Sequence, residues 1–300
     1  MKVTVAKSSG FCFGVKTAVA AAQEAVGNPP SGVPLVMLGD IVHNTMVVES
    51  LKKGGFTVVD NASDVPEGAF VLIRAHGITP SEMEILKSRG CVIKDCTCPF
   101  VSKIHKIVRE NALEGRNIIV TGGKGHPEVV GICGETYGTG VSCAVISSPE
   151  ELESLDFPLS SAILVSQTTF SSNIFKEICK KAENKIANKY VFDTICITTE
   201  SRQKEAASLS GESDSMLVIG SSHSSNTTKL LDICKGRCAR TFLVNSAEEA
   251  GRLIAEGKIL PDDRVGITAG ASTPEAIILE VVQKMNEDEN KKTENQQLDS

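Results

Sequence analysis

The chain has 300 residues, of which 41% are hydrophobic, and its formal net charge is −6. This much apolar sequence can bury a substantial core, and the negative charge argues against a protein that coats nucleic acid, which requires a basic surface. Only 4% of the residues are aromatic and Trp is absent, so sheets covered by helices fit the composition better than an aromatic-rich β-sandwich.

The sequence shows no sign of secretion or membrane insertion. No stretch reaches the roughly 18–20 continuous apolar residues of a membrane span, and the first six residues are too short an apolar run for a signal peptide. We therefore expect a cytoplasmic protein with no membrane or nucleic-acid partner. In a reducing compartment its ten cysteines are expected to be buried thiols or metal ligands, not disulfides.

A cysteine followed at once by a helical pattern occurs three times. The three are Cys12 before residues 16–26, Cys98 before residues 101–113, and Cys196 before residues 200–209. The second helix has Pro99 at its first position, where proline is well tolerated. This recurrence indicates three copies of one structural plan.

Each copy continues with two short apolar strands that end in polar loops. These strands are predicted over residues 35–38, 70–73, 117–120, 162–165, 216–219 and 264–267. Short apolar runs alternating with helices indicate parallel βα units, which bind ligands beyond the carboxyl ends of their strands. The sequence therefore predicts three similar α/β domains in a pseudo-threefold arrangement, over residues 1–97, 98–193 and 194–283, followed by a disordered polar tail over 284–300.

Cys12, Cys98 and Cys196 are the three cysteines placed at predicted helix starts, where the helix dipole favours a thiolate. Three thiolates meeting at one point suit an iron–sulfur cluster with one iron left open for a substrate, whereas four Cys ligands close the cluster. The alternative is three inert buried thiols, because no C-x₂-C-x₂-C run is present.

The other seven cysteines are expected to be structural. Neither the C-x-C pair at Cys96 and Cys98 nor the C-x₃-C pair at Cys234 and Cys238 has two further zinc ligands nearby. The seven are Cys91, Cys96, Cys133, Cys143, Cys179, Cys234 and Cys238.

Three histidines, His43, His76 and His126, stand in predicted strand-end loops, where an imidazole can donate a hydrogen bond or pair with a phosphate. One alone could be an ordinary loop histidine, but three in equivalent positions favour a function. Glu128 follows in the same loop as His126 and is placed for proton transfer; the alternative is a glutamate favoured by a helix start. His105 is interpreted as structural, because it lies inside a predicted helix.

Hydroxyl and amide side chains occupy other strand-end loops. Thr168 and Thr169 follow one strand and the run Ser224-Ser225-Asn226 follows another, where they could bind phosphate oxygens at a helix start. The alternative is that they are ordinary helix N-caps, which use the same residue types.

With these motifs in order, the chain resembles the LytB family, the 4-hydroxy-3-methylbut-2-enyl diphosphate reductases of the non-mevalonate isoprenoid route. The likeness runs from about Met1 to Glu280 and rests on nine motifs. These are Gly10–Val15, Val42–Asn44, Ala75–Gly77, Thr97–Pro99, Gly125–Glu128, Gln167–Thr169, Asp193–Cys196, Ser224–Asn226 and Thr268–Ser272.

The resemblance implies three α/β domains around one central 4Fe–4S iron–sulfur cluster bound by Cys12, Cys98 and Cys196, which can lose an iron and be isolated as 3Fe–4S. It implies reductive dehydroxylation of (E)-4-hydroxy-3-methylbut-2-enyl diphosphate to isopentenyl diphosphate and dimethylallyl diphosphate. A ferredoxin or flavodoxin would supply the electrons.

The resemblance also implies roles for the loop residues. Glu128 would donate a proton, with His126 and Thr168 also catalytic and Thr199 supporting the substrate network. The residues implied to hold the diphosphate are His43, His76, His126, Ser224, Ser225, Asn226 and Ser272.

Two other classes of function would use some of the same residues. A non-catalytic iron–sulfur sensor for a phosphorylated metabolite would share the cysteines and the phosphate loops but would not require Glu128 or Thr168. A zinc hydrolase using His43, His76 and His126 is disfavoured, because no H-x-x-x-H or H-E-x-x-H spacing occurs.

Overall fold

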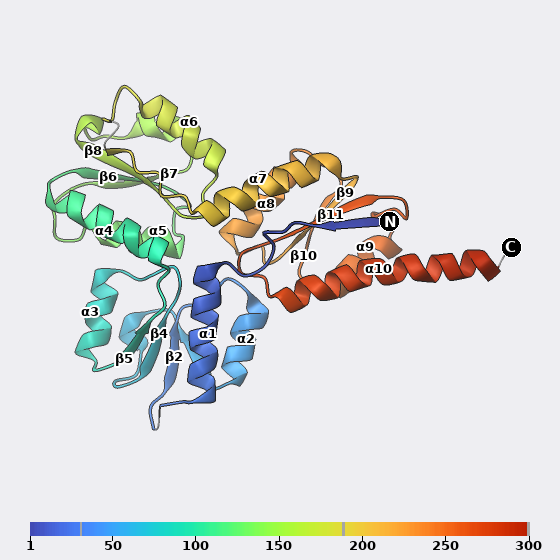
Figure 1. Cartoon of the computed structure of the whole chain (residues 1–300). Helices are drawn as coiled ribbons and strands as arrows, with labels where there is room; N and C mark the ends of the chain where they lie inside the picture. The colour runs from blue at the N-terminus through green and yellow to red at the C-terminus, as the bar shows by residue number, and fades with distance from the viewer. Residues whose placement is uncertain (31, 188–189, 299–300) are drawn as a thin grey trace. The chain divides into compact units, whose positions relative to one another are not determined.

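The computed structural model describes the backbone of residues 1–30, 32–187 and 190–298, and the side chains of these residues up to Glu287. The described strands form three parallel sheets, with helices between successive strands (Figure 1). The predicted α/β class with three parallel-sheet segments is therefore confirmed. Two compact units divide the chain. One comprises Met1–Cys12, His43–Thr45 and Ile197–Ser300, and the other Phe13–Val42 and Met46–Cys196.

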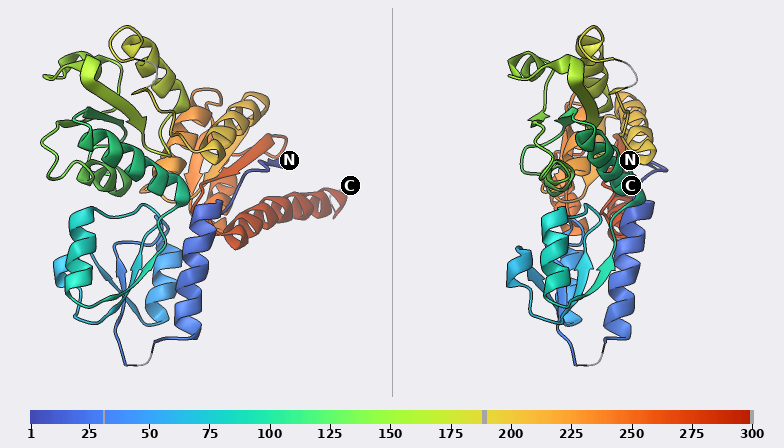
Figure 2. Two further views of the ribbon diagram at one scale, coloured as in Figure 1. Left: turned by 60° about the vertical axis from the view of Figure 1, so that its left-hand side comes forward. Right: turned by 90° about the vertical axis from the view of Figure 1, so that its left-hand side faces the viewer.

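The second unit contains two of the sheets, and the first of these has the strand order β3-β2-β4-β5. Its strands are β2 (Leu35–Leu38), β3 (Phe56–Val59), β4 (Phe70–Ile73) and β5 (Val92–Asp95). All four residues of β2 are buried, as expected for a parallel strand with both faces covered. Helices α1 (Phe13–Gly27) and α3 (Pro80–Ser88) lie on opposite faces of this sheet (Figures 1 and 2), and α2 (Thr45–Lys53) leads into β3.

The other sheet of this unit has the order β7-β6-β8. Its elements are α4 (Pro99–Leu113), β6 (Asn117–Thr121), α5 (Pro127–Gly134), β7 (Cys143–Ile146), β8 (Ala162–Ser166) and α6 (Ser172–Ala182). Helices α4 and α5 share one apolar cluster with β6 and β8, which includes Ile104, Ile132 and Val165. Helix α6 packs into a separate cluster through Phe175 and Ile178. Both faces of the sheet are therefore covered.

The first unit is built on a sheet of order β1-β11-β9-β10. Its elements are β1 (Lys2–Val5), α7 (Ile197–Glu212), β9 (Ser215–Ile219), α8 (Ser225–Lys235), β10 (Thr241–Val244), α9 (Ala247–Ala255), β11 (Arg264–Ala269) and α10 (Glu275–Leu298). Serine side chains start two of these helices: Ser224 Oγ accepts a hydrogen bond from the Thr227 amide, and Ser246 Oγ from the Glu249 amide.

The two ends of the chain differ from the sequence prediction. Strand β1 pairs with β11, from Lys2 beside Arg264 to Val5 beside Ile267, so the first residues complete the last sheet and do not belong with residues 13–97. Helix α10 continues to Leu298, where a disordered tail over 284–300 was predicted; Asp299 and Ser300 lie outside the described residues. That segment is rich in Glu, Lys and Gln, which favour helix without any apolar periodicity. No described helix is long and apolar enough to cross a membrane.

Each sheet contains one point at which the direction of winding reverses. The chain moves from β2 outward to β3 and then crosses to β4 on the other side of β2; the same happens from β6 to β7 and then β8, and from β9 to β10 and then β11. Loops on either side of such a point diverge and leave a crevice where ligands of open α/β sheets bind. Ligand-binding residues are therefore expected in the loops after β2 and β4, β6 and β8, and β9 and β11.

Candidate active site at the carboxyl ends of the strands

The candidate residues lie in these loops. His43 follows β2 and His76 follows β4; His126 and Glu128 follow β6, and Thr168 follows β8; Ser224, Ser225 and Asn226 follow β9, and Ser272 follows β11. The sequence prediction of polar strand-end loops therefore places every one of these residues beside a topological switch point.

Glu128 is buried on the first turn of α5, with 1% of its surface exposed. Both its carboxylate oxygens are bonded to Thr168 across the switch point: the Thr168 amide donates to Oε1 at 2.6 Å, and the hydroxyl donates to Oε2 at 2.8 Å. Burial raises the pKa of Glu128 to about 7, and the Thr168 bonds and the charge of His105 oppose that rise. Glu128 can therefore exchange a proton near neutral pH.

His126 is the N-cap of α5, and its Nδ1 accepts a hydrogen bond from the Glu128 amide at 3.2 Å. Because Nδ1 acts as an acceptor, the proton of the neutral ring lies on Nε2. Nε2 is then a hydrogen-bond donor. The arrangement suits an anionic ligand, since a metal would require the lone pair of that nitrogen.

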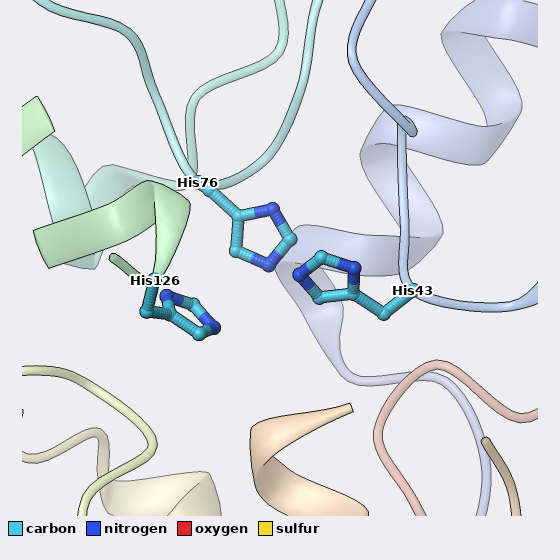
Figure 3. Close-up of side chains that lie close together, drawn as sticks. All are labelled: His43, His76 and His126. Atoms are coloured by element: carbon cyan, nitrogen blue, oxygen red, sulfur yellow. The ribbon is translucent and has the colours of Figure 1, made fainter. Parts of the chain in front are cut away.

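His76 lies beside His126, with the two rings edge to face at a centroid distance of 5.4 Å and an interplanar angle of 83° (Figure 3). His43 is in the loop between β2 and α2, and one ring nitrogen from each of His43, His76 and His126 lies within 4.8 Å of the other two. Three imidazoles at this spacing can hold a metal ion or the oxygens of a phosphate. The donor role of His126 favours the phosphate and counts against the zinc hydrolase.

Gln167 ties the loop of His126 to the loop of Thr168. Its Oε1 accepts a hydrogen bond from the Gly123 amide at 3.0 Å, and its Nε2 donates to the Thr169 hydroxyl at 2.8 Å. A side chain added at Gly122 would meet Gln167 and Val129, so the loops approach closely. The sequence predicts no individual role for Gln167, whereas in the structure its side chain holds the two loops of the switch point together.

Cys98 and Cys196 are held next to these loops by backbone hydrogen bonds. The Cys98 amide donates to the Ala75 carbonyl at 3.0 Å, beside His76, and the Cys196 amide donates to the Thr168 carbonyl at 3.0 Å. Each stands directly before a helix, Cys98 as the N-cap of α4 and Cys196 before α7. A Cβ at Gly14 would lie 2.7 Å from Cys98 Sγ, so the start of α1 fits against this thiol only as glycine.

In the other unit, Cys12 immediately precedes α1, and its amide donates to the Ala271 carbonyl at 3.2 Å. Arg202, which the sequence analysis did not single out, is buried beneath this segment: its guanidinium donates to the carbonyl oxygens of Gly10 at 2.6 Å and Ala269 at 3.1 Å. The segment that carries Cys12 is thereby fixed to the loop that carries Ser272.

The hydroxyl and amide residues after β9 and β11 differ in whether their polar atoms are already hydrogen-bonded within the protein. Ser224 is the N-cap of α8, where its Oγ accepts a hydrogen bond from the Thr227 amide. Asn226 is 4% exposed, and its buried Nδ2 has no hydrogen-bond partner among the described residues, so it is a donor awaiting an acceptor. Ser272 Oγ donates to the His43 carbonyl at 3.2 Å, and Thr199 is buried on the first turn of α7.

The other seven cysteines do not open helices. Cys96, Cys234 and Cys238 are buried, and desolvation raises the pKa of the Cys96 thiol to about 11 and that of Cys234 to about 12. Cys133 on α5 and Cys143 on β7 pack against the same apolar cluster. Neutral thiols in these surroundings are consistent with a structural role.

The chain is similar to known proteins over nearly its whole length. A model of the LytB protein family matches residues 3–286. A Caldanaerobacter subterraneus subsp. tengcongensis protein named 4-hydroxy-3-methylbut-2-enyl diphosphate reductase is 39% identical over 296 residues, which cover 97% of this chain and 100% of that protein.

Two solved structures share the fold. One is the E-1-hydroxy-2-methyl-but-2-enyl-4-diphosphate reductase from Plasmodium falciparum, with a TM-score of 0.82, 29% identity, and coverage of 94% of this chain and 87% of that one. The other is an (E)-4-hydroxy-3-methyl-but-2-enyl diphosphate reductase described as the terminal enzyme of the non-mevalonate pathway. Its TM-score is 0.67, its identity 34%, and coverage is 96% of this chain and 100% of that one.

Proposed function

Because this chain belongs to the LytB protein family and is a 4-hydroxy-3-methylbut-2-enyl diphosphate reductase, the terminal enzyme of the non-mevalonate pathway, we propose that Glu128 is the proton donor of its reaction. The observation that carries this proposal is the buried Glu128–Thr168 pair at the switch point of its sheet. A sensor that only bound the ligand would have no use for a carboxyl group with a pKa of about 7.

The reaction removes an allylic hydroxyl group. Two electrons and two protons are consumed: the C–O bond breaks, the oxygen leaves as water, and one C–H bond forms on one of the two terminal allylic carbons to give isopentenyl or dimethylallyl diphosphate. Hydroxide is a poor leaving group, so the oxygen must be protonated as the bond breaks. Glu128 carries out this step with the proton on a carboxylate oxygen, while the Thr168 amide and hydroxyl fix the orientation of the group.

The donor set of the chain fits an iron–sulfur cluster. Cys12, Cys98 and Cys196, whose sulfurs are the usual protein ligands of such clusters, each stand directly before a helix, and a Cβ added at Gly14 would lie 2.7 Å from the Cys98 sulfur. We infer that these three thiolates hold a 4Fe–4S cluster. When bound, the cluster supplies single electrons and one Lewis-acidic iron without a protein ligand. A ferredoxin or flavodoxin delivers the electrons in the cytoplasm.

The diphosphate is held by neutral donors, because the loops at the switch points offer imidazole, hydroxyl and amide groups. His126 presents Nε2–H. Asn226 presents a side-chain amide that is already buried in the folded protein, so the cost of removing this group from water does not arise when the diphosphate binds. The remaining donors of this set are His43, His76, Ser224, Ser225 and Ser272, with Thr168 and Thr199 nearer the alcohol end. Binding a remote, non-reacting group in this way orients the reacting carbon.

The test is anaerobic purification followed by analysis of iron and sulfide and by turnover with a chemical reductant and the allylic diphosphate. We expect broad visible absorption near ~400 nm and activity that depends on iron content. An iron-free preparation with full activity would refute the cluster. Binding of the diphosphate without any turnover would favour the sensor.

A further inference from the structure

His105 lies in the interior of the second unit, on the second turn of α4, which Cys98 opens. Its Nδ1 is 2.8 Å from Glu135 Oε1, and Glu135 is the C-cap of α5, the helix that begins with His126 and Glu128. A carboxylate only accepts hydrogen bonds, so Nδ1 carries the proton and donates it to Glu135. The imidazole therefore links α4 to the far end of the catalytic helix.

The other nitrogen of this ring faces two glycines. Nε2 is buried and has no hydrogen-bond partner among the described residues. A Cβ added at Gly131 would lie 3.3 Å from Nε2 and 3.1 Å from Cε1, and one added at Gly77 would also lie 3.3 Å from Nε2. Gly77 has a φ of +75°, which favours glycine for a second reason. The ring thus fits between two backbones that approach it only because they lack side chains.

Both glycines are adjacent to candidate active-site residues. Gly77 follows His76 in the loop after β4, and Gly131 stands three residues after Glu128, on the same face of α5 one turn further along. The charge of His105 also acts on Glu128 and opposes the rise in its pKa caused by burial. The His105 imidazole therefore separates the loop of His76 from the helix of Glu128, and it also affects the pKa of Glu128.

We propose that His105, anchored by Glu135, is a positioning residue that sets the placement of Glu128 relative to His76. The proposal deepens the proposed function and rests on Glu128 being the proton donor. His105 touches neither reacting atom, so it is not itself a catalytic residue. The sequence interpretation of His105 as a merely structural residue did not foresee this role.

Other charged groups on the elements around His105 have hydrogen-bond partners. Glu135 accepts its hydrogen bond, Arg109 donates to the Glu135 carbonyl at 3.0 Å and to the Tyr137 carbonyl at 3.1 Å, and Glu82 is engaged in the capping box at the start of α3. On β5, Asp95 accepts hydrogen bonds from Thr97.

The test compares His105→Leu with Arg109→Leu in the cluster-loaded enzyme. Both substitutions remove ties from α4 to the end of α5, but only the first removes the imidazole beside Gly131. We expect His105→Leu to lower kcat roughly ten-fold and to move the fall of kcat at high pH upward by about half a unit or more, because Glu128 loses a neighbouring positive charge. Arg109→Leu should lower the melting temperature and leave the pH profile in place.

Glu135→Gln keeps the volume of the pair and an acceptor for Nδ1, so it addresses the case in which His105→Leu does not fold. It should shift the pH profile in the same direction by a smaller amount. A wild-type pH profile in Glu135→Gln, or equal shifts in His105→Leu and Arg109→Leu, would overturn the positioning role. Glu128→Gln, measured in parallel, separates this outcome from failure of the proposed function. A fully active Glu128→Gln enzyme would show that Glu128 is not the proton donor.

Discussion

Thr168 gives Glu128 two hydrogen bonds, from its amide to Oε1 and from its hydroxyl to Oε2, across adjacent strand ends of one sheet. Both bonds favour the ionised carboxylate, whereas burial favours the neutral acid and is the larger effect. The resulting pKa of about 7 lets the group hold a proton and release it near neutral pH. The acidity of Glu128 can therefore be altered through Thr168 without replacing the carboxyl group.

Replacing the carboxyl group itself should stop proton delivery. We expect Glu128→Gln to reduce kcat by roughly 10²–10⁴-fold, the usual contribution of a general acid, while iron content and visible absorption stay at wild-type values. The measurement is steady-state turnover under anaerobic conditions. Glu110→Gln, an exposed glutamate on α4, is the control and should be fully active. Wild-type turnover in Glu128→Gln would exclude it from the proton path.

Removing the Thr168 hydroxyl should make Glu128 a weaker acid. We expect Thr168→Val to raise the pKa of Glu128, because a hydrogen bond to the charged form is lost, and to shift the fall of kcat at high pH upward by roughly one unit. The Thr168→Ser variant keeps the hydroxyl and should retain the wild-type profile. The pH dependence of kcat for the two variants decides the matter, and identical profiles would contradict the role of this bond.

The raised pKa of Glu128 also predicts how stability depends on pH. The folded value of about 7 lies above the ordinary value of 4.5, so the carboxyl group contributes stability that is fully present below about pH 4.5 and is lost as the pH rises through about 7. Denaturant unfolding measures the free energy of unfolding of wild type and of Glu128→Gln. Relative to the variant, the wild-type value should fall by roughly 2–4 kcal/mol between pH 4.5 and 8. A difference that is constant with pH would contradict this.

Asn226 should contribute to substrate affinity. Asn226→Asp replaces a buried donor by a carboxylate that repels a diphosphate, so KM should rise by roughly 100-fold or more, with a smaller effect on kcat. Asn245→Asp is the matched control, because Asn245 is an exposed residue after the edge strand β10 of the same sheet, away from the switch point. Equal KM values for the two variants would show that Asn226 does not bind the diphosphate.

The iron content of purified variants should distinguish the three proposed cluster ligands from a structural cysteine. We expect Cys98→Ala to lose most of its iron, and Cys12→Ala and Cys196→Ala to behave likewise, since each removes one of three ligands. Cys96→Ala should keep the cluster, because the Cys96 thiol is buried and its pKa of about 11 keeps it neutral. Iron retained in Cys98→Ala but lost in Cys96→Ala would reverse the assignment.

Local pattern was enough to predict the loops that matter. Apolar runs of four or five residues locate strands such as β2 and β8, and the polar residues that follow them must lie at the sheet edge, so His43 and Thr168 could be found from the sequence. Cys98 could be found because Pro99 marks a helix start. Each of these features is contained within a few neighbouring residues.

The long-range relationships could not be predicted in the same way. Nothing in the short segment Lys2–Val5 specifies β11 as its partner. The Glu128–Thr168 bonds join residues forty positions apart, and His105 follows the periodicity of an ordinary buried helix residue until Glu135 and the two glycines are brought beside it. These contacts depend on how strands are ordered in the sheet, which the hydrophobic pattern leaves open.

The pairing of β1 with β11 has a consequence for synthesis on the ribosome. Domains generally form in order as the chain emerges, and the two sheets of the second unit can assemble from residues 13–196 while translation continues. Strand β1, made first, has no partner until residues 264–267 appear, and the Cys12 amide gains its acceptor only with Ala271. We therefore expect nascent chains to acquire a stable metal centre only when nearly complete.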